Sequence, residues 1–149
     1  PEHHRAFLSC EDNHLMTVFD LDRHVPIAFL PEARGADVVQ FDVGLGRIYV
    51  ACYSGAISVF QEETPDRYRK IEDFPVPYAV HSIAIDPATH RVYAPEQQVE
   101  GRPASKLAIY EAVLSGADRQ AMTLALILTA TSVVVIYATN VLTRSSKPA

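Results

Sequence analysis

Hydrophobic and polar residues alternate in short runs through most of residues 1–113. The clearest example is 47–60, RIYVACYSGAISVF, in which two alternating runs rich in β-branched and aromatic residues flank Ser54-Gly55. Alternation with a period of two is typical of β-strands, and a short glycine-containing segment between two strands favours a tight turn. The pattern therefore predicts a β-hairpin at 47–60.

The same hairpin pattern recurs along the chain. Its first strand appears as RAFLSC, RIYVAC and RVYAPE at residues 5–10, 47–52 and 91–96. Its second strand appears as MTVFD, ISVFQ and LAIYE at residues 16–20, 57–61 and 107–111. The arginines that begin the first strand are 42 and then 44 residues apart. The chain is therefore a repeat protein with a period in the low forties.

Two further strands complete the repeat. One precedes the hairpin at 36–43 and 80–86, and another follows it at 25–30 and 68–74. Four short strands per unit at this period predict the blade of a β-propeller, in which stacking buries both faces of each sheet. The fold class expected is all-β: a partial β-propeller of about two and a half four-stranded blades, followed by a C-terminal transmembrane helix.

Three stretches suggest a family. Residues 49–52 (YVAC) stand where YVTN-type repeats place Tyr-Val-Thr-Asn, and 86–93 (DPATHRVY) match that family's D-P-x-x-x-R-V-Y run. Residues 18–20 (VFD) match its V-x-V-[IF]-D strand. Residues 5–113 thus resemble the YVTN-type β-propeller repeat family. The resemblance implies the fold but no single activity, because the members of this family have very different roles.

The sequence departs from the YVTN-type pattern at one repeated position. Cys10, Cys52 and Glu96 stand where the family usually has Asn. Equivalent positions on adjacent blades usually lie farther apart than the roughly 4.4–6.8 Å between the Cα atoms of a disulfide. We therefore expect Cys10 and Cys52 to be small buried packing residues rather than a disulfide.

Composition argues against several classes of function. The net charge is −5 and the basic residues are scattered, so a nucleic-acid partner has no electrostatic support. The sequence contains no nucleophile elbow, phosphate-binding loop, Cys-x-x-Cys, His-Glu-x-x-His or EF-hand pattern. No catalytic residue, metal site or cofactor is therefore predicted.

His81 is the best single candidate for a ligand-binding residue. It lies at the start of the predicted inner strand 80–86, where propellers of this type open towards the central channel. The alternative is that His81 hydrogen-bonds a neighbouring loop and binds nothing. A polar stretch at 97–105 (QQVEGRPAS) predicts a long loop, which is either a binding surface on one rim or a tolerated insertion.

Composition changes sharply after residue 113. Residues 114–120 indicate a short linker, 121–142 contain no charged residue, and 143–149 form a short basic tail. Because a membrane-spanning helix needs about 20 residues, 121–142 predict a transmembrane helix. The alternative is a pair of strands, since 133–136 favour β structure, but no turn residue divides the run.

The charges around this segment predict its orientation. Arg144 and Lys147 follow it and Arg119 precedes it, which favours a cytoplasmic C-terminus and a propeller outside the cytoplasm, in the periplasm or at the cell surface. The alternative is a tail-anchored cytosolic propeller. Because propellers typically have about four to eight blades, we expect either that the chain is the C-terminal part of a longer protein or that several copies close the ring.

Two hypotheses about function remain. The first is a non-catalytic binding or scaffold module that contacts a protein or cell-surface ligand through its blade loops and the membrane through 121–142. The second is an enzyme or cofactor-binding protein with a site in the central channel. The resemblance implies this possibility, because some related propellers carry metals or redox cofactors there, and His81 would then be a ligand or a polar contributor.

Overall fold

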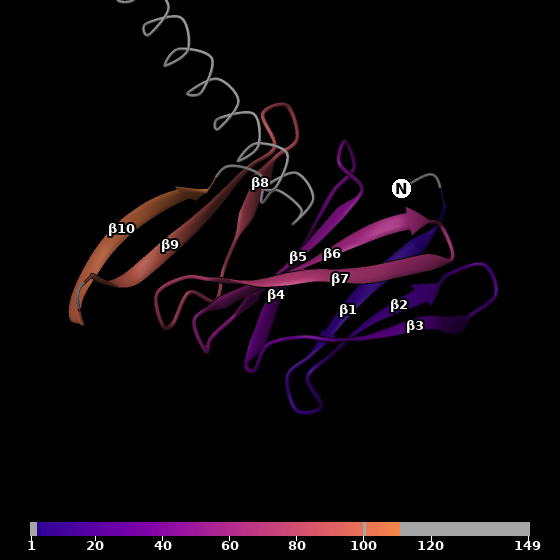
Figure 1. Ribbon diagram of the computed structural model, residues 1–149, viewed down its shortest axis with the longest axis horizontal. Coiled ribbons are helices and arrows are strands. Elements are labelled where there is room, and N and C mark those ends of the chain that lie inside the picture. The colour runs from indigo at the N-terminus through magenta and orange to yellow at the C-terminus, as the bar shows by residue number, and fades with distance from the viewer. Residues whose placement is uncertain (1–2, 100, 111–149) are drawn as a thin grey trace, which may run out of the picture. The chain divides into compact units, whose positions relative to one another are not determined.

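The computed structural model describes residues 3–99 and 101–110, which fold into ten β-strands in three antiparallel sheets (Figure 1). This confirms the all-β prediction. The predicted linker 114–120, transmembrane helix 121–142 and basic tail 143–149 lie outside the described residues. Within the described ranges, no helix is long and apolar enough to cross a membrane.

Each sheet is built from strands that follow one another in the sequence. The first sheet has the order β1-β2-β3, with β1 at Arg5–Cys10, β2 at Leu15–Asp20 and β3 at Val25–Pro31. The central sheet has the order β4-β5-β6-β7, with bounds Ala36–Asp42, Arg47–Cys52, Ala56–Thr64 and Arg67–Pro75. The third sheet has the order β10-β9-β8, with β8 at Ala84–Asp86, β9 at Arg91–Val99 and β10 at Arg102–Tyr110. Strands β1, β5 and β9 thus begin at the three repeated arginines.

One predicted loop is instead a pair of strands. Strands β9 and β10 continue through most of 97–105, where Arg102 pairs with Val99 and Pro103 with Gln98. The prediction was wrong because polar composition alone does not prevent a ladder once Gly101, at φ 74°, makes the tight turn. In the same way β6 and β7 extend into 61–67, and Glu63 ion-pairs with Arg69 across the two strands at 2.8 Å.

The third inner strand is shorter than predicted. Only Ala84–Asp86 pair with β9, whereas the predicted strand began at residue 80. The reason is local: the Ala79 amide donates to the Tyr53 carbonyl at 3.0 Å, so this part of the chain is held against the turn after β5. His81 therefore lies in an irregular segment that precedes β8, not in a strand.

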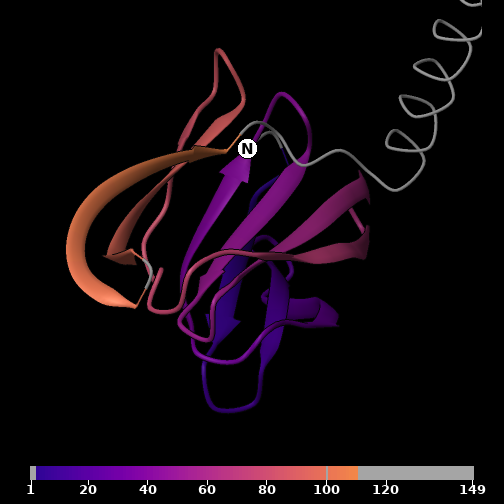
Figure 2. The same cartoon turned by 60° about the vertical axis from the view of Figure 1, so that its left-hand side comes forward.

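The central sheet is covered on both faces, as its position in Figure 2 shows. Successive side chains of a strand point to opposite faces, so β5 sends Ile48 and Val50 towards the first sheet and Tyr49 and Ala51 towards the third. All four are fully buried. Burial on both sides explains why β5 is almost continuously apolar.

A second contact between the first and central sheets is ionic. The Arg5 guanidinium, largely buried, pairs with Asp20 at 3.1 Å and with Asp66 of the β6–β7 turn at 2.8 Å. Arg23 also pairs with Asp20, at 2.6 Å. Hydrogen bonds from the Arg23 amide and guanidinium lower the pKa of Asp20 to about 2. The cluster therefore holds the β6–β7 turn against the start of the repeat.

Candidate binding surface around His81

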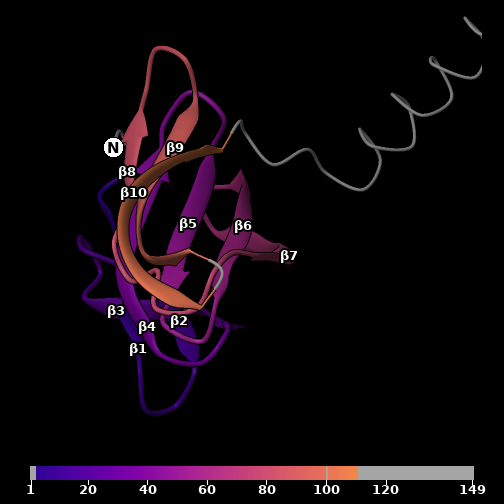
Figure 3. The ribbon, with the colours of Figure 1, turned by 90° about the vertical axis from the view of Figure 1, so that its left-hand side faces the viewer.

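His81 lies among side chains contributed by the central and third sheets, which Figure 3 shows one in front of the other. Its imidazole contacts Asp37 from the start of β4, Tyr53 from the turn after β5, and Gln97 from β9. Tyr78, from the β7–β8 connection, packs against Tyr53. We call these five residues the His81 surface: Asp37, Tyr53, Tyr78, His81 and Gln97.

Two hydrogen bonds orient the imidazole of His81. Its Nδ1 lies 3.1 Å from Asp37 Oδ2, and its Nε2 lies 2.8 Å from the Gln97 side-chain nitrogen. These two contacts hold the imidazole ring in one orientation between Asp37 and Gln97.

Tyrosine rings form the apolar part of this surface. Tyr53 and Tyr78 are both exposed, with ring centroids 5.3 Å apart in an edge-to-face arrangement. The centroid of the His81 ring lies 5.6 Å from that of the Tyr53 ring. Exposed tyrosines beside a carboxylate and an amide can supply apolar contact area and hydrogen bonds to the same ligand.

Main-chain hydrogen bonds hold the loops that carry these rings. The Tyr53 amide donates to the Gly35 carbonyl at 2.6 Å, and the Val76 amide donates to the Gly55 carbonyl at 3.1 Å. At Gly35, φ is 71° and an added Cβ would lie 2.9 Å from the Tyr53 Cβ, so glycine is required by both conformation and space. Three separate loops are therefore fixed to one another before any ligand binds.

The direction of the Asp37 side chain follows from a strand irregularity. Ala36 pairs with Cys52 and Val38 with Ala51, which leaves Asp37 as the extra residue of a β-bulge. A bulge bends the strand locally and redirects a side chain. Asp37 is thus exposed and turned towards His81, although its neighbours on β4 belong to the core.

Sequence reasoning found His81 but none of its partners. One alternative for His81 was that it hydrogen-bonds a neighbouring loop and binds nothing. The hydrogen bonds to neighbouring segments are present, and a role of His81 in ligand binding stays a prediction. Gln97 falls in a predicted loop, and Asp37 was not singled out from the sequence. Two signals were available: Asp37 holds the position equivalent to His81 in the preceding repeat, and Tyr53 is a large aromatic residue beside the Ser54-Gly55 turn that the turn itself does not need.

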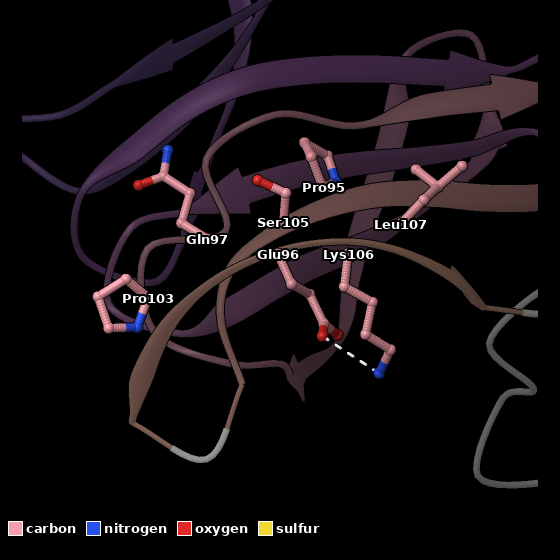
Figure 4. A pocket seen from close by; sticks show the side chains of 7 residues that line it. All are labelled: Pro95, Glu96, Gln97, Pro103, Ser105, Lys106 and Leu107. Atoms are coloured by element: carbon pink, nitrogen blue, oxygen red, sulfur yellow. Dashed lines mark ion pairs between the residues drawn. The ribbon is translucent and has the colours of Figure 1, made fainter.

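Residues of β9 and β10 line an open cavity of about 690 Å³ (Figure 4). Two charged residues line it: Glu96, which is buried, pairs with Lys106 at 3.3 Å. Glu96 also accepts a hydrogen bond from the Tyr110 hydroxyl at 3.1 Å. Burial, together with this carboxylate, raises the pKa of Tyr110 to about 12. The charge of Glu96 is therefore already compensated within the chain.

The two cysteines are free and have different environments. Cys52 is fully buried and Cys10 is half-buried, so the expectation of a buried packing residue is confirmed for Cys52 alone. Burial raises the pKa of the Cys52 thiol. Next to Cys10, the buried Glu32 carboxylate accepts hydrogen bonds from Ser9 and the Cys10 amide, and desolvation raises its pKa. These hydrogen bonds satisfy the Glu32 carboxylate within the chain.

The described residues contain no group of three or more His, Cys, Asp or Glu side chains placed to hold a metal ion. In comparisons with known proteins, no family model matches the chain and no curated protein is significantly similar to it. The resemblance to YVTN-type repeats therefore rests on the sequence motifs alone.

Proposed function

We propose that the three sheets are blades of a YVTN-like β-propeller and that the protein is a binding or scaffold module. Its ligand would be a protein or cell-surface molecule that contacts the His81 surface. The observation that carries this proposal is a group of exposed aromatic and hydrogen-bonding side chains on loops fixed by main-chain hydrogen bonds.

The arrangement of the sheets supports the propeller part of the proposal. Each sheet packs through alternate side chains on the next, and equivalent strands neighbour one another: β4 lies beside β8, and β3 beside β7. Stacking of this kind buries both faces of a small sheet, as propellers do. The chemistry of the surface supports the binding part, because fixed tyrosines lose little conformational entropy when they contact a partner.

Site-specific photo-crosslinking tests the binding proposal. A photoreactive phenylalanine analogue at position 78 should form an adduct with a cell-surface molecule, whereas the same analogue at Val43, which is exposed in the β4–β5 turn, should not. A second change, His81→Ala, should reduce the adduct at position 78 by about tenfold or more, because truncating a hot-spot residue at the centre of an interface costs about 2 kcal/mol or more. Equal adducts at both positions, or no effect of His81→Ala, would contradict the proposal.

We further propose that residues 121–142 anchor the protein in a membrane, with the sheets outside the cytoplasm. The support is the uncharged length of this segment and the positive charges that follow it. The substitution Ala130→Arg, near the middle of the segment, should release the protein from membranes on alkaline extraction. The reason is that an arginine at the centre of a membrane helix makes the free energy of insertion less favourable by about 2.5–3.5 kcal/mol. The matched change Ser145→Arg, beyond the segment, should leave the protein in the membrane fraction, and release of both or neither variant would refute the anchor.

A further inference from the structure

The outer face of the third sheet is apolar and exposed. Leu107 is 61% exposed and Ile109 is 55% exposed. They pair across the strands with Pro95 and Tyr93, respectively, so the four side chains form one continuous face. No described residue packs against this face as a further sheet.

The repeat shows what such a face contacts elsewhere in the same chain. The central sheet carries Ile57 and Val59 at the positions of Leu107 and Ile109, and these are only 2% and 0% exposed. They are buried because Val92 and Ala94 of the third sheet pack on them. The same positions of the first sheet, Met16 and Val18, are buried against the central sheet in the same way.

The first sheet presents the complementary face. Leu8 pairs with Thr17, and Thr17 with Phe29, which places the three side chains in one row across the sheet. Leu8 is 47% and Phe29 is 60% exposed. In the central sheet, the positions of Leu8 and Thr17 are held by Val50 and Ser58, both fully buried on the side of the first sheet. The two ends of the stack thus carry the two halves of a contact that the chain makes twice internally.

We propose that the outer face of the third sheet binds the outer face of the first sheet of a second copy of this chain, head to tail. The contact would continue the two interfaces already present, with the same repeat positions on each side. The described residues of two copies supply six sheets, within the roughly four to eight at which such stacks close into a ring, so we expect a closed dimer with two identical contacts. This stoichiometry rests on the propeller proposed above, whereas the contact itself does not.

Complementation between two face variants tests the contact. Leu8→Glu places a charge on one face and Ile109→Glu on the other, and both positions are exposed enough that the sheets should still fold. The full chain is purified in detergent, and its mass is measured by analytical ultracentrifugation with the detergent density-matched, so that 121–142 contribute equally to every sample. The wild-type protein should be a dimer, and each variant alone should be a monomer. The reason is that an uncompensated charge in a buried contact lowers its affinity by about 100-fold or more.

An equal mixture of the two variants should form dimers again. The Leu8→Glu variant keeps the outer face of its third sheet intact, and the Ile109→Glu variant keeps the outer face of its first sheet intact. The variant Val43→Glu carries a matched apolar-to-acidic change in an exposed turn and should remain a dimer. Any of three results would overturn the proposal. They are a monomeric wild type, a face variant that is still a dimer on its own, and an equal mixture of the two variants that stays monomeric. Crosslinking at position 78 is scored separately, so failure of this contact and failure of ligand binding are distinguishable.

Discussion

Ser58 joins three segments of the core, and its loss should be costly for a side chain so small. It is fully buried on β6, donates a hydrogen bond to Asp73 of β7 at 2.6 Å, and accepts one from the Ala33 amide at 2.9 Å. Ala33 belongs to the connection between the first and central sheets. Ser58→Ala therefore removes a side-chain oxygen that links β6 both to its neighbour strand and to this connection.

The expected cost follows from these two bonds. A hydrogen bond to a charged group contributes about 1.5–3 kcal/mol and one between neutral groups about 0.5–1.5 kcal/mol. Asp73 is partly exposed and can be rehydrated when the Ser58 hydroxyl is lost, so the contribution of its hydrogen bond lies at the low end of the range for charged groups. The Ala33 amide lies in a half-buried connection. We expect Ser58→Ala to lower the free energy of unfolding by about 2–3 kcal/mol, which is a fall in Tm of about 10 °C or more.

Urea unfolding of the full chain in a mild detergent, followed by far-ultraviolet circular dichroism, measures this cost. Ser54→Ala, in the exposed turn after β5, is the matched control and should change stability by less than about 0.5 kcal/mol. Asp73→Asn keeps an acceptor for the Ser58 hydroxyl, so its effect should lie between the two. If Ser58→Ala is as stable as Ser54→Ala, the hydroxyl does not hold these segments together and the reasoning is wrong.

Three further predictions test other parts of the structure. The folded pKa of Asp20, held at about 2 by hydrogen bonds from Arg23, lies below its ordinary value of 3.8; its stabilising contribution is therefore present above about pH 4 and lost as the pH falls towards 2. Asp20→Asn should reduce the change in the free energy of unfolding between about pH 4 and about pH 2. An unchanged pH dependence in this range would contradict the lowered pKa of Asp20. In the native protein a thiol reagent should modify Cys10 well before Cys52, whose thiol is buried and has a raised pKa; equal rates would show that the core opens readily. Gly35→Ala should lower stability by about 1–2 kcal/mol, measured by thermal unfolding, because φ is positive and the new Cβ meets a tyrosine of the His81 surface.

The strands could be predicted from sequence because the repeat supplies two or three independent observations of each. The arginine at residues 5, 47 and 91 marks the same strand start, and alternation around it identifies the buried face. The ends of β9 and β10 could not be predicted in this way. Gln97, Gly101 and Pro103 have the composition of a loop, and only the pairing register shows that the ladder continues past them.

The His81 surface was largely beyond sequence reasoning for a different reason. Asp37 is 44 residues from His81, which is the spacing of the second and third repeated arginines, so the two hold equivalent repeat positions; Gln97 is 16 residues from His81 and has no such relation to it. Their approach depends on a bulge that turns Asp37 outwards and on the extension of β9 as far as Gln97. Both are irregularities of the strands, whereas the repeat signal describes only what is regular.

The repeated position held by Cys10, Cys52 and Glu96 shows how far a repeat constrains its residues. In the central sheet, Cys52 is enclosed by strands on either side and only a small side chain fits. In the third sheet, Glu96 is also buried, but Lys106 and the Tyr110 hydroxyl supply a charge and a hydrogen bond at its carboxylate. A buried carboxylate is tolerated only with such partners. Sequence variation at this position therefore follows what the neighbouring strand offers, and it does not by itself indicate a change of function between repeats.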